Sequence, residues 1–338
     1  MQLIENFSLK KFNTFGIDVQ AHLFTEITCL KDFEELISIH HGSGLPLLPL
    51  GGGSNILFTK DYTGLVAKIS NKGIKIISEN ENDVLIEAAA GELWEDLIGY
   101  CIKNKYYGLE NLSGIPGQVG SSPIQNIGAY GVEVKDCIKE VGTIDLDDGR
   151  NRNFSGAECN FSYRDSIFKR ELKNKVIITN VVFKLSKVEH FNLKYGGVLE
   201  EIRRISDETP GIAAVSKAIS NIRGRKIPEP KDLGSAGSFF KNPVITNELF
   251  EQLIKKYPDM PNYPANDNKR KLAAGWLVEQ CGWKGYRAGD AGVCENQALI
   301  LVNFGNVSGT EILELSKKIR ESIFEKFGIN IDPEVNIL

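Results

Sequence analysis

The stretch that decides the fold is residues 113–133, SGIPGQVGSSPIQNIGAYGVE. It holds five glycines, two prolines and two adjacent serines, and its first charged residue is Glu133. Because Pro fixes φ and lacks an amide donor while Gly opens φ > 0, this density of both residues predicts a shaped loop instead of a regular helix or strand. Four apolar side chains should hold the loop against the protein: Ile115, Val119, Ile124 and Ile127.

The absence of charge from residues 113–132 indicates what covers this loop. Solvated loops usually carry Lys, Glu and Asp, so an ordinary surface loop is the alternative that this composition disfavours. Small residues let a ligand approach the backbone closely, and clustered N–H groups favour an anion such as a pyrophosphate. We therefore expect a bound cofactor at the loop.

Length and composition restrict the class of protein. The chain has 338 residues, enough for two or three domains, and 40 basic and 44 acidic residues give a formal net charge of −4. This mixed charge predicts no nucleic-acid partner and no membrane insertion. The N-terminus lacks the pattern of a secretory signal and no apolar run approaches a membrane span of ~18 residues, so we expect a cytoplasmic protein.

The cysteines and histidines show no ligand spacing. The six cysteines lie far apart and the four histidines form no set, so we expect reduced thiols and no metal. Cys281 and Cys294 are interpreted as packing residues, because no His lies near either in the sequence to activate it.

A second glycine-rich stretch, GGGSN at residues 51–55, follows the apolar run 45–50, which we expect to be a buried strand. The stretch lacks the GK[ST] of a P-loop and is not a G-x-G-x-x-G before a helix, which disfavours a mononucleotide or Rossmann site. Its amides could surround a phosphate group. A plain hairpin turn is at least as compatible with these residues.

The remaining elements follow from periodicity and turn residues. A helix after the strand VLIEAAA should present Leu93, Leu97, Tyr100 and Cys101 on one face. A hairpin should turn at Asp148-Gly149, with Ser155 and Glu158 capping a short helix after it. We further expect helices at 31–41, 211–226, 248–256, 271–282 and 310–327, strands at 176–185 and 297–304, and a polar loop at 258–269.

Together with FSYRDSIFK (161–169), GSAGSFFKNP (234–243) and DPEV (332–335), the two glycine-rich stretches form five ordered motifs. This set closely resembles the UDP-N-acetylenolpyruvoylglucosamine reductase family, and GSFFKNP fits its type I branch. The resemblance spans nearly the whole chain. It implies an α+β protein, with an FAD-binding fold of the p-cresol methylhydroxylase and vanillyl-alcohol oxidase type in two subdomains (1–70 and 71–210) and an α/β substrate-binding domain (211–338).

The resemblance also implies where FAD binds. No histidine lies in the matching motifs, so FAD should be bound noncovalently. The implied cofactor-binding residues are Gly52, Gly53, Ser54, Asn55, Ile115, Pro116, Gly120, Ser121, Ser122, Ile124 and Gly128.

Three residues match the family's catalytic positions. The implied reaction passes a hydride from NADPH to flavin N5 and then to the β-carbon of an enolpyruvyl ether, after which the α-carbon takes a proton. Ser238 resembles the proton donor, Arg164 the clamp on the substrate carboxylate, and Glu334 a partner that must be protonated to donate. Taken singly, each has an ordinary interpretation: an Arg164–Asp165 surface ion pair, a turn serine and a solvated carboxylate.

The matching positions for the sugar nucleotide are Tyr130, Tyr163, Tyr195, Lys226, Asn242 and Gln297. Lys226 suits a diphosphate as a point charge, although a lysine at a helix end is also favoured by the helix dipole. Tyr195, in KYGG, resembles the tyrosine that closes over substrate in type I members, and it could equally be a loose surface anchor.

The resemblance implies that the chain converts UDP-N-acetylglucosamine enolpyruvate to UDP-N-acetylmuramate for peptidoglycan synthesis. NADPH and the enolpyruvyl substrate should use one pocket in turn, and the protein should be a monomer or weak oligomer. Two alternatives stay open: an FAD-dependent alcohol or sugar oxidase of the same superfamily, and an inactive flavin or nucleotide-sugar binding module.

Overall fold

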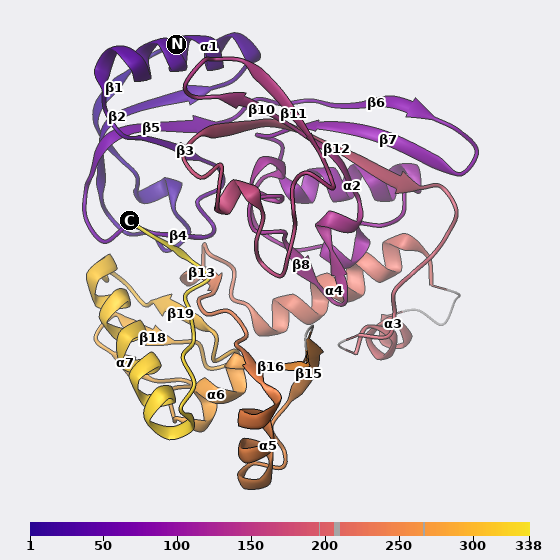
Figure 1. Cartoon of the computed structure of the whole chain (residues 1–338), viewed down its shortest axis with the longest axis vertical. Coiled ribbons are helices and arrows are strands. Elements are labelled where there is room, and N and C mark those ends of the chain that lie inside the picture. Colours follow the sequence, from indigo (N-terminus) through magenta and orange to yellow (C-terminus); the bar gives the residue numbers. More distant parts are fainter. Residues whose placement is uncertain (196, 206–209, 266–267) are drawn as a thin grey trace. The chain divides into compact units, whose positions relative to one another are not determined.

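The computed structural model describes residues 1–195, 197–205, 210–265 and 268–338 (Figure 1). The chain forms two compact units. The first unit comprises residues 1–7, 21–52 and 62–224, and the second comprises 8–20, 53–61 and 225–338. The division into 1–70, 71–210 and 211–338 stays a prediction.

The first sheet lies almost wholly in the first unit and has the strand order β1-β2-β5-β3. Its strands are β1 (Ile4–Ser8), β2 (Gln20–Ile27), β5 (Tyr62–Ile69) and β3 (Leu47–Leu50). β5 pairs in parallel with both β2 and β3. Helix α1 (Leu30–Ser43) buries Phe33 and Leu36 in the same core as Leu65 of β5, and Figure 1 shows it beside this sheet. The predicted helix 31–41 is confirmed, and the predicted strand 45–50 forms at Leu47–Leu50, where only Leu50 is fully buried.

The second sheet of the first unit has the order β11-β10-β12-β7-β6, with every neighbouring pair antiparallel. Its strands are β6 (Ile74–Glu79), β7 (Asp83–Ala89), β10 (Ile138–Asp145), β11 (Asn151–Ser155) and β12 (Val176–Ser186). Helix α2 (Trp94–Asn104) packs Trp94 edge-on against Phe183 of β12. Leu97 and Cys101 are buried as predicted, but Leu93 is 47% exposed because it is the N-cap residue, where the chain has not yet entered the helix.

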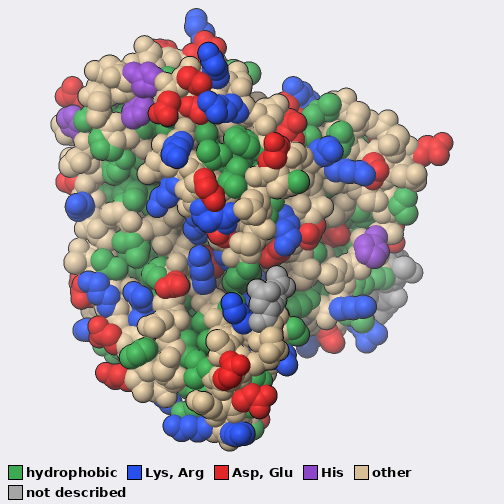
Figure 2. Space-filling view, viewed as in Figure 1, with side chains coloured by type: hydrophobic (Ala, Val, Ile, Leu, Met, Phe, Trp, Pro, Cys, Tyr) green, Lys and Arg blue, Asp and Glu red, His purple; other side chains and the backbone are tan. Residues whose placement is uncertain are grey.

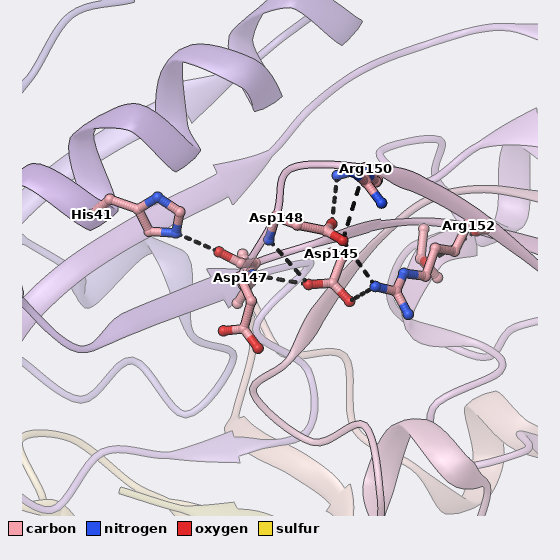
Figure 3. A network of polar contacts seen from close by, with 8 residues as sticks. His41, Asp145, Asp147, Asp148, Arg150 and Arg152 are labelled. Carbon is pink, nitrogen blue, oxygen red and sulfur yellow. Dashed lines mark hydrogen bonds and ion pairs between the residues drawn. The ribbon is translucent and has the colours of Figure 1, made fainter.

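The predicted hairpin at Asp148-Gly149 joins β10 to β11 (Figure 3). The Asp145 carboxylate accepts hydrogen bonds from the amides of Asp147 and Asp148 and pairs with Arg152 at 3.2 Å. His41 of α1 lies 2.6 Å, ring Nε2 to carbonyl oxygen, from Leu146 in the same turn. Polar contacts thus fix the turn from both sides.

The prediction of a short helix after this hairpin is wrong. Ser155 and Glu158 do exchange the hydrogen bonds of a capping box, yet only a turn follows them. Asn160 has φ 44°, a left-handed conformation that ends any helical path after one turn. The cap therefore forms without the helix.

Two further helices belong mainly to the first unit: α3 (Val198–Ile205) and α4 (Ile212–Lys226), the second as predicted. They share a small core that contains Val198, Ile202, Val215 and Ile219. Single-turn 3₁₀ helices and a hairpin of two short strands also precede β12, with η1 in the second unit: η1 (Lys10–Phe12), η2 (Glu110–Leu112), η3 (Val119–Ser121), η4 (Val134–Asp136), η5 (Ile167–Lys169), β8 (Gly128–Ala129) and β9 (Val132–Glu133).

The second unit contains a sheet of order β13-β19-β18-β17, a sheet of order β14-β16-β15 and the pair β20-β4. The strands are β4 (Ile56–Leu57), β13 (Gly234–Ser238), β14 (Val244–Thr246), β15 (Asn262–Ala265), β16 (Lys269–Leu272), β17 (Arg287–Ala288), β18 (Ala291–Val293), β19 (Ile300–Asn303) and β20 (Asn336–Ile337). Its helices are α5 (Asn247–Lys256), α6 (Ala274–Gln280) and α7 (Gly309–Phe327).

The predicted loop at 258–269 is confirmed at 258–261 but wrong at Asn262–Ala265 and at Lys269, where β15 and the start of β16 form; residues 266 and 267 lie outside the described residues. The predicted helix 271–282 begins late, at Ala274, because β16 continues to Leu272. The last helix is confirmed. Ser308 and Glu311 exchange the hydrogen bonds of a capping box at its start. The helix buries Ile312, Leu315, Ile319 and Ile323.

Figure 2 shows basic and acidic side chains interspersed over the visible face, without a continuous patch of either sign. In the described ranges no helix is both long enough and apolar enough to span a membrane. All six cysteines are free thiols, four of them buried, with Cys29 exposed and Cys281 partly exposed.

Candidate functional site

The two glycine-rich stretches meet inside the first unit. A Cβ atom on Gly52 would lie 3.0 Å from the Cα atom of Gly117, and one on Gly51 would lie 3.2 Å from Oε1 of Gln118. Side chains at these glycines would separate the two backbones. The two main chains therefore lie against each other along one seam, where small residues let a ligand approach the backbone closely.

The central loop is anchored to the end of β7. Val119 N donates to Glu92 O and Gly120 N to Ala90 O, each at 2.9 Å. Val119 and Ile127 are buried, and Ile115 packs against the core from its edge, as predicted. The prediction for Ile124 is wrong, since its side chain is 37% exposed. The loop is thus rigidly placed while this one apolar side chain faces outward.

Two polar atoms of the loop are buried without a hydrogen-bond partner within the described part of the chain. Gln118 donates through Nε2 to Ile69 O and Gly91 O, which leaves its Oε1 unpaired, and the hydroxyl of Ser122 is unpaired as well. Such an atom costs about 1–3 kcal/mol unless a ligand satisfies it. A polar cofactor with both donors and acceptors, such as FAD, fits these residues. The sequence reasoning missed Gln118, although a lone amide side chain among glycines was a usable signal.

Arg164 stands over the hairpin of β8 and β9. Its guanidinium donates to the carbonyls of Gly128 at 2.7 Å and Asn126 at 3.4 Å. Its backbone has φ 56°, an uncommon conformation for a side chain of this size. The neighbouring Asp165 pairs with Arg170.

Three predicted site tyrosines, Tyr130, Tyr163 and Tyr195, lie around the same hairpin. Tyr130 (φ 47°) and Gly131 (φ 78°) form its two-residue turn, and a Cβ on Gly131 would lie 3.5 Å from the Cβ of Tyr195. Asn111 Nδ2 donates to the carbonyls of Tyr130 and Asn192, which joins the turn to the segment before Tyr195. The Arg164 guanidinium lies 5.4 Å from the ring centre of Tyr163.

Arg223 is a further cation at the loop that the sequence reasoning missed. Its Nε donates to Gly114 O at 3.0 Å, while the amide of Gly114 donates to the Glu95 carboxylate at 2.9 Å. Burial lowers the pKa of Arg223; Tyr130 raises it, and the positive charge of Arg164 lowers it further. Its place in the basic run RGRK (223–226) at the end of a helix was the available signal.

In the second unit the turn after Gly52 continues against the N-terminal segment. Gly53 has φ 64°, and a Cβ there would lie 2.0 Å from Phe12 O, so only glycine fits. Asn55 donates through Nδ2 to Glu334 O at 3.3 Å, and Asn336 N donates to Asn55 O. The turn therefore holds the segment that carries Glu334.

The segments that carry Ser238 and Glu334 form an antiparallel pairing within the second unit. Glu334 N donates to Phe239 O at 2.7 Å, and Phe240 forms a bridge with Pro333. Ser238 ends β13 directly after Gly237, whose φ of 67° accompanies a register shift against β19. Residues 96 positions apart thus come within one residue of each other in register.

Two other residues of the second unit meet at the start of α6. The side chain of Asn242 accepts a hydrogen bond from Ala274 N at 2.9 Å, and Gln297 Oε1 lies 3.2 Å from a Cβ position on Gly275. Lys226 is the last residue of α4. Asn242 has a structural role as the cap of α6, whatever else it binds.

The sequence-predicted site residues thus fall into two sets. The first unit holds Gly52, Ile115, Pro116, Gly120, Ser121, Ser122, Ile124, Gly128, Tyr130, Tyr163, Arg164 and Tyr195. The second unit holds Gly53, Ser54, Asn55, Lys226, Ser238, Asn242, Gln297 and Glu334.

Comparison with known sequences gives two matching family models. The model described as UDP-N-acetylenolpyruvoylglucosamine reductase, C-terminal domain, matches residues 229–338, and an FAD binding domain matches 22–155. A UDP-N-acetylenolpyruvoylglucosamine reductase of Flavobacterium johnsoniae is 46% identical over 339 residues, covering 100% of both chains. One from Bacteroides fragilis is 45% identical, covering 99% of both.

Solved structures agree in fold. The crystal structure of UDP-N-acetylenolpyruvylglucosamine reductase from Thermus caldophilus has a TM-score of 0.67 at 23% identity, covering 99% of this chain and 98% of that one. A solvent-stable cholesterol oxidase has a TM-score of 0.52 at 11% identity, covering 98% and 86%. The predicted α+β class with an FAD-binding fold is confirmed.

Proposed function

Because the chain belongs to the UDP-N-acetylenolpyruvoylglucosamine reductase family of FAD-dependent oxidoreductases, we propose that it reduces UDP-N-acetylglucosamine enolpyruvate to UDP-N-acetylmuramate with NADPH as reductant. The pairing that brings the backbone of Ser238 within one residue of Glu334 in register is the observation that carries the proposal, since it joins the two segments that match the family's proton donor and its partner. In this proposal the product serves peptidoglycan synthesis in the cytoplasm.

The seam between residues 51–52 and 117–122 is the proposed cofactor site. The small residues there would let the pyrophosphate lie close to the main chain, and Gln118 Oε1 and Ser122 Oγ would gain the partners that they lack within the described chain. Bound FAD supplies a ring that accepts a hydride from NADPH and passes it to the substrate. NADPH and substrate take turns in one pocket.

The substrate's enolpyruvyl carboxylate is the proposed ligand of Arg164. When the β-carbon gains a hydride, negative charge spreads from the α-carbon into this carboxylate, and a guanidinium stabilises it there. Ser238 Oγ gives its proton to the α-carbon, which completes the addition of one hydride and one proton across the double bond. Glu334, protonated, assists Ser238.

The sugar nucleotide takes the remaining proposed contacts. Lys226 would neutralise the diphosphate. Tyr130, Tyr163 and Tyr195 lie on the first unit beside Arg164's hairpin, where aromatic rings could cover a bound ligand. Asn242 and Gln297, at the start of α6, would bind through whichever polar atoms the helix cap leaves free.

Ser238→Ala tests whether Ser238 acts only in the second half-reaction, in which the substrate reoxidises the flavin. Reduction of the flavin by NADPH should proceed at nearly the wild-type rate, and reoxidation by the enolpyruvyl substrate should slow about 10²- to 10⁴-fold, the range for a positioned general acid. Stopped-flow absorbance under anaerobic conditions measures both rates. Ser235→Ala, in the same strand, is the matched control and should alter neither rate appreciably.

Equal slowing of both half-reactions in Ser238→Ala would contradict the role of Ser238. Reduced wild-type protein that is not reoxidised by the enolpyruvyl substrate would refute the proposed function itself. Rapid reoxidation by oxygen in place of the substrate would favour an oxidase.

A further inference from the structure

Asn126 is a fully buried side chain in the middle of the central loop, with 0% of its surface exposed. Its backbone is left-handed, with φ 43°. Asn is one of the few side chains that adopt this conformation readily, yet most such residues lie on exposed turns. A buried one indicates that its amide group has a specific task.

The side-chain amide of Asn126 makes three hydrogen bonds to two segments of the first unit. Nδ2 donates to Ser162 O at 2.9 Å and to the Glu133 carboxylate at 3.1 Å, while Oδ1 accepts from Lys135 N at 3.1 Å. One side chain therefore ties the loop both to the segment from the end of β9 into η4 and to the turn that carries Arg164.

That turn is a tight one. Ser162 and Asp165 exchange two main-chain hydrogen bonds, at 3.0 and 3.2 Å, so Tyr163 and Arg164 occupy its tip. Arg164 adopts its uncommon φ of 56° there. A non-glycine residue in this region costs on the order of 1–3 kcal/mol and persists only where neighbouring structure enforces it.

Asn126 also meets Arg164 from the other end. The main-chain carbonyl of Asn126 accepts a hydrogen bond from the Arg164 guanidinium, as does the carbonyl of Gly128 two residues on. The side chain of Asn126 thus hydrogen-bonds the first residue of the Arg164 turn, and its main-chain carbonyl orients the guanidinium. One residue therefore contacts both the turn that holds the Arg164 backbone and the charged group of Arg164.

We propose that Asn126 is the positioning residue of the carboxylate site: it fixes the guanidinium of Arg164 where the enolpyruvyl carboxylate binds. The inference rests on the proposed function, because that function assigns the carboxylate to Arg164. Asn126 touches neither substrate nor cofactor in this scheme and acts only through Arg164.

Asn126→Asp tests the proposal with little change of shape. Aspartate keeps an acceptor for Lys135 N, loses the donor to Ser162 O and faces Glu133 with a like charge. In the FAD-loaded protein, reduction by NADPH should stay within about threefold of wild type, and reoxidation by the enolpyruvyl substrate should slow at least about tenfold, equivalent to about 1.4 kcal/mol.

A double-mutant cycle separates positioning from a general loss of structure. In the Arg164→Met background Asn126→Asp should have little further effect on reoxidation, because the group that it orients is gone. Ser166→Ala is the matched control: it removes another buried hydrogen bond between the same two segments, from Ser166 Oγ to Ile124 O at 2.7 Å, without touching Arg164. Its effect should be equally small in both backgrounds.

A second readout uses affinity for the substrate carboxylate. UDP-N-acetylglucosamine lacks the enolpyruvyl group, so the ratio of its Kd to that of the enolpyruvyl compound reports the contribution of the carboxylate. Asn126→Asp should shrink this ratio at least about tenfold, as Arg164→Met does. If Asn126→Asp fails to retain FAD, Asn126→Ser, which adds no charge, replaces it in both measurements.

Equal slowing of reoxidation by Asn126→Asp with Arg164 present or replaced would overturn the proposal, as would an unchanged affinity ratio. Both results require an active wild-type protein. A wild-type protein that cannot reduce the enolpyruvyl compound overturns the proposed function and this inference together.

Discussion

Gly120→Ala is expected to damage the cofactor site, because a side chain at this position would push the central loop away from β7. A Cβ atom at this position would lie 2.5 Å from Cβ of Ala90 and 3.1 Å from both its Cα and its carbonyl oxygen. Carbon atoms pack at about 3.5–4.0 Å, so the loop has to retreat by roughly 1 Å or β7 has to yield.

The retreat acts directly on the hydrogen bonds that place the loop. Gly120 N to Ala90 O and Val119 N to Glu92 O, both 2.9 Å, would lengthen beyond 3.5 Å. Two such bonds contribute about 1–3 kcal/mol, and overpacking adds about as much. Even if half of this cost falls on the cofactor-bound state alone, FAD affinity should drop about 10- to 100-fold.

Titration of apoprotein with FAD, followed by quenching of flavin fluorescence, measures the change. Gly99→Ala is the matched control, since a Cβ there meets nothing within 4 Å and Gly99 lies within α2, away from the loop. Gly120→Ala protein with an FAD Kd within about threefold of wild type would show that the loop does not set the cofactor site, and the reasoning from glycine packing would be refuted.

Three other predictions concern different parts of the chain. Gly99→Ala should itself stabilise the protein by about 0.5–1 kcal/mol, measured by urea denaturation, because Ala is the better helix residue. Arg223→Met should weaken FAD binding about 5- to 30-fold in the same fluorescence titration, since it frees the Gly114 carbonyl from a charged donor; unchanged affinity would exclude this role. Burial lowers the pKa of Lys68 from 10.5 to about 8, so between these pH values the unfolded chain binds more protons and stability rises with pH. Lys68→Met should flatten that rise in urea denaturation at pH 8 and 10, and an identical slope would contradict it.

Local sequence signals predicted the elements whose causes are local. The helix ending at Phe327 combines a capping box at Ser308 with a periodic apolar face, and both formed. The polar stretch 258–269 concealed β15 because strand pairing with β16 supplies its stability, and Pro264 is tolerated on this edge strand. The capping box at Ser155 was predicted correctly, but it gives no information about the left-handed backbone of Asn160, which ends the turn.

The candidate site shows the same difference between local and long-range causes. The glycines of the central loop predicted a close approach to its main chain, because the lack of a side chain is a property of each position by itself. No local pattern predicts that Glu334 pairs with Phe239, or that Arg223 reaches Gly114, since both contacts span long stretches of chain. Gln118 and Asn126 are a different case from these long-range contacts. In the sequence each is an ordinary loop residue, and only its hydrogen-bond partners in the structure indicate its role.

Three separate segments of the chain form the second unit, and this limits how the protein can be expressed as two fragments. A fragment beginning at Arg225 would lack Leu57 and Thr59, whose main chains pair with Leu338, and Phe15, whose carbonyl receives Asn303 Nδ2. Such a fragment would expose unpaired strand edges and invite aggregation. Complementation by separately expressed halves should therefore fail unless the N-terminal half brings residues 8–20 and 53–61 to its partner.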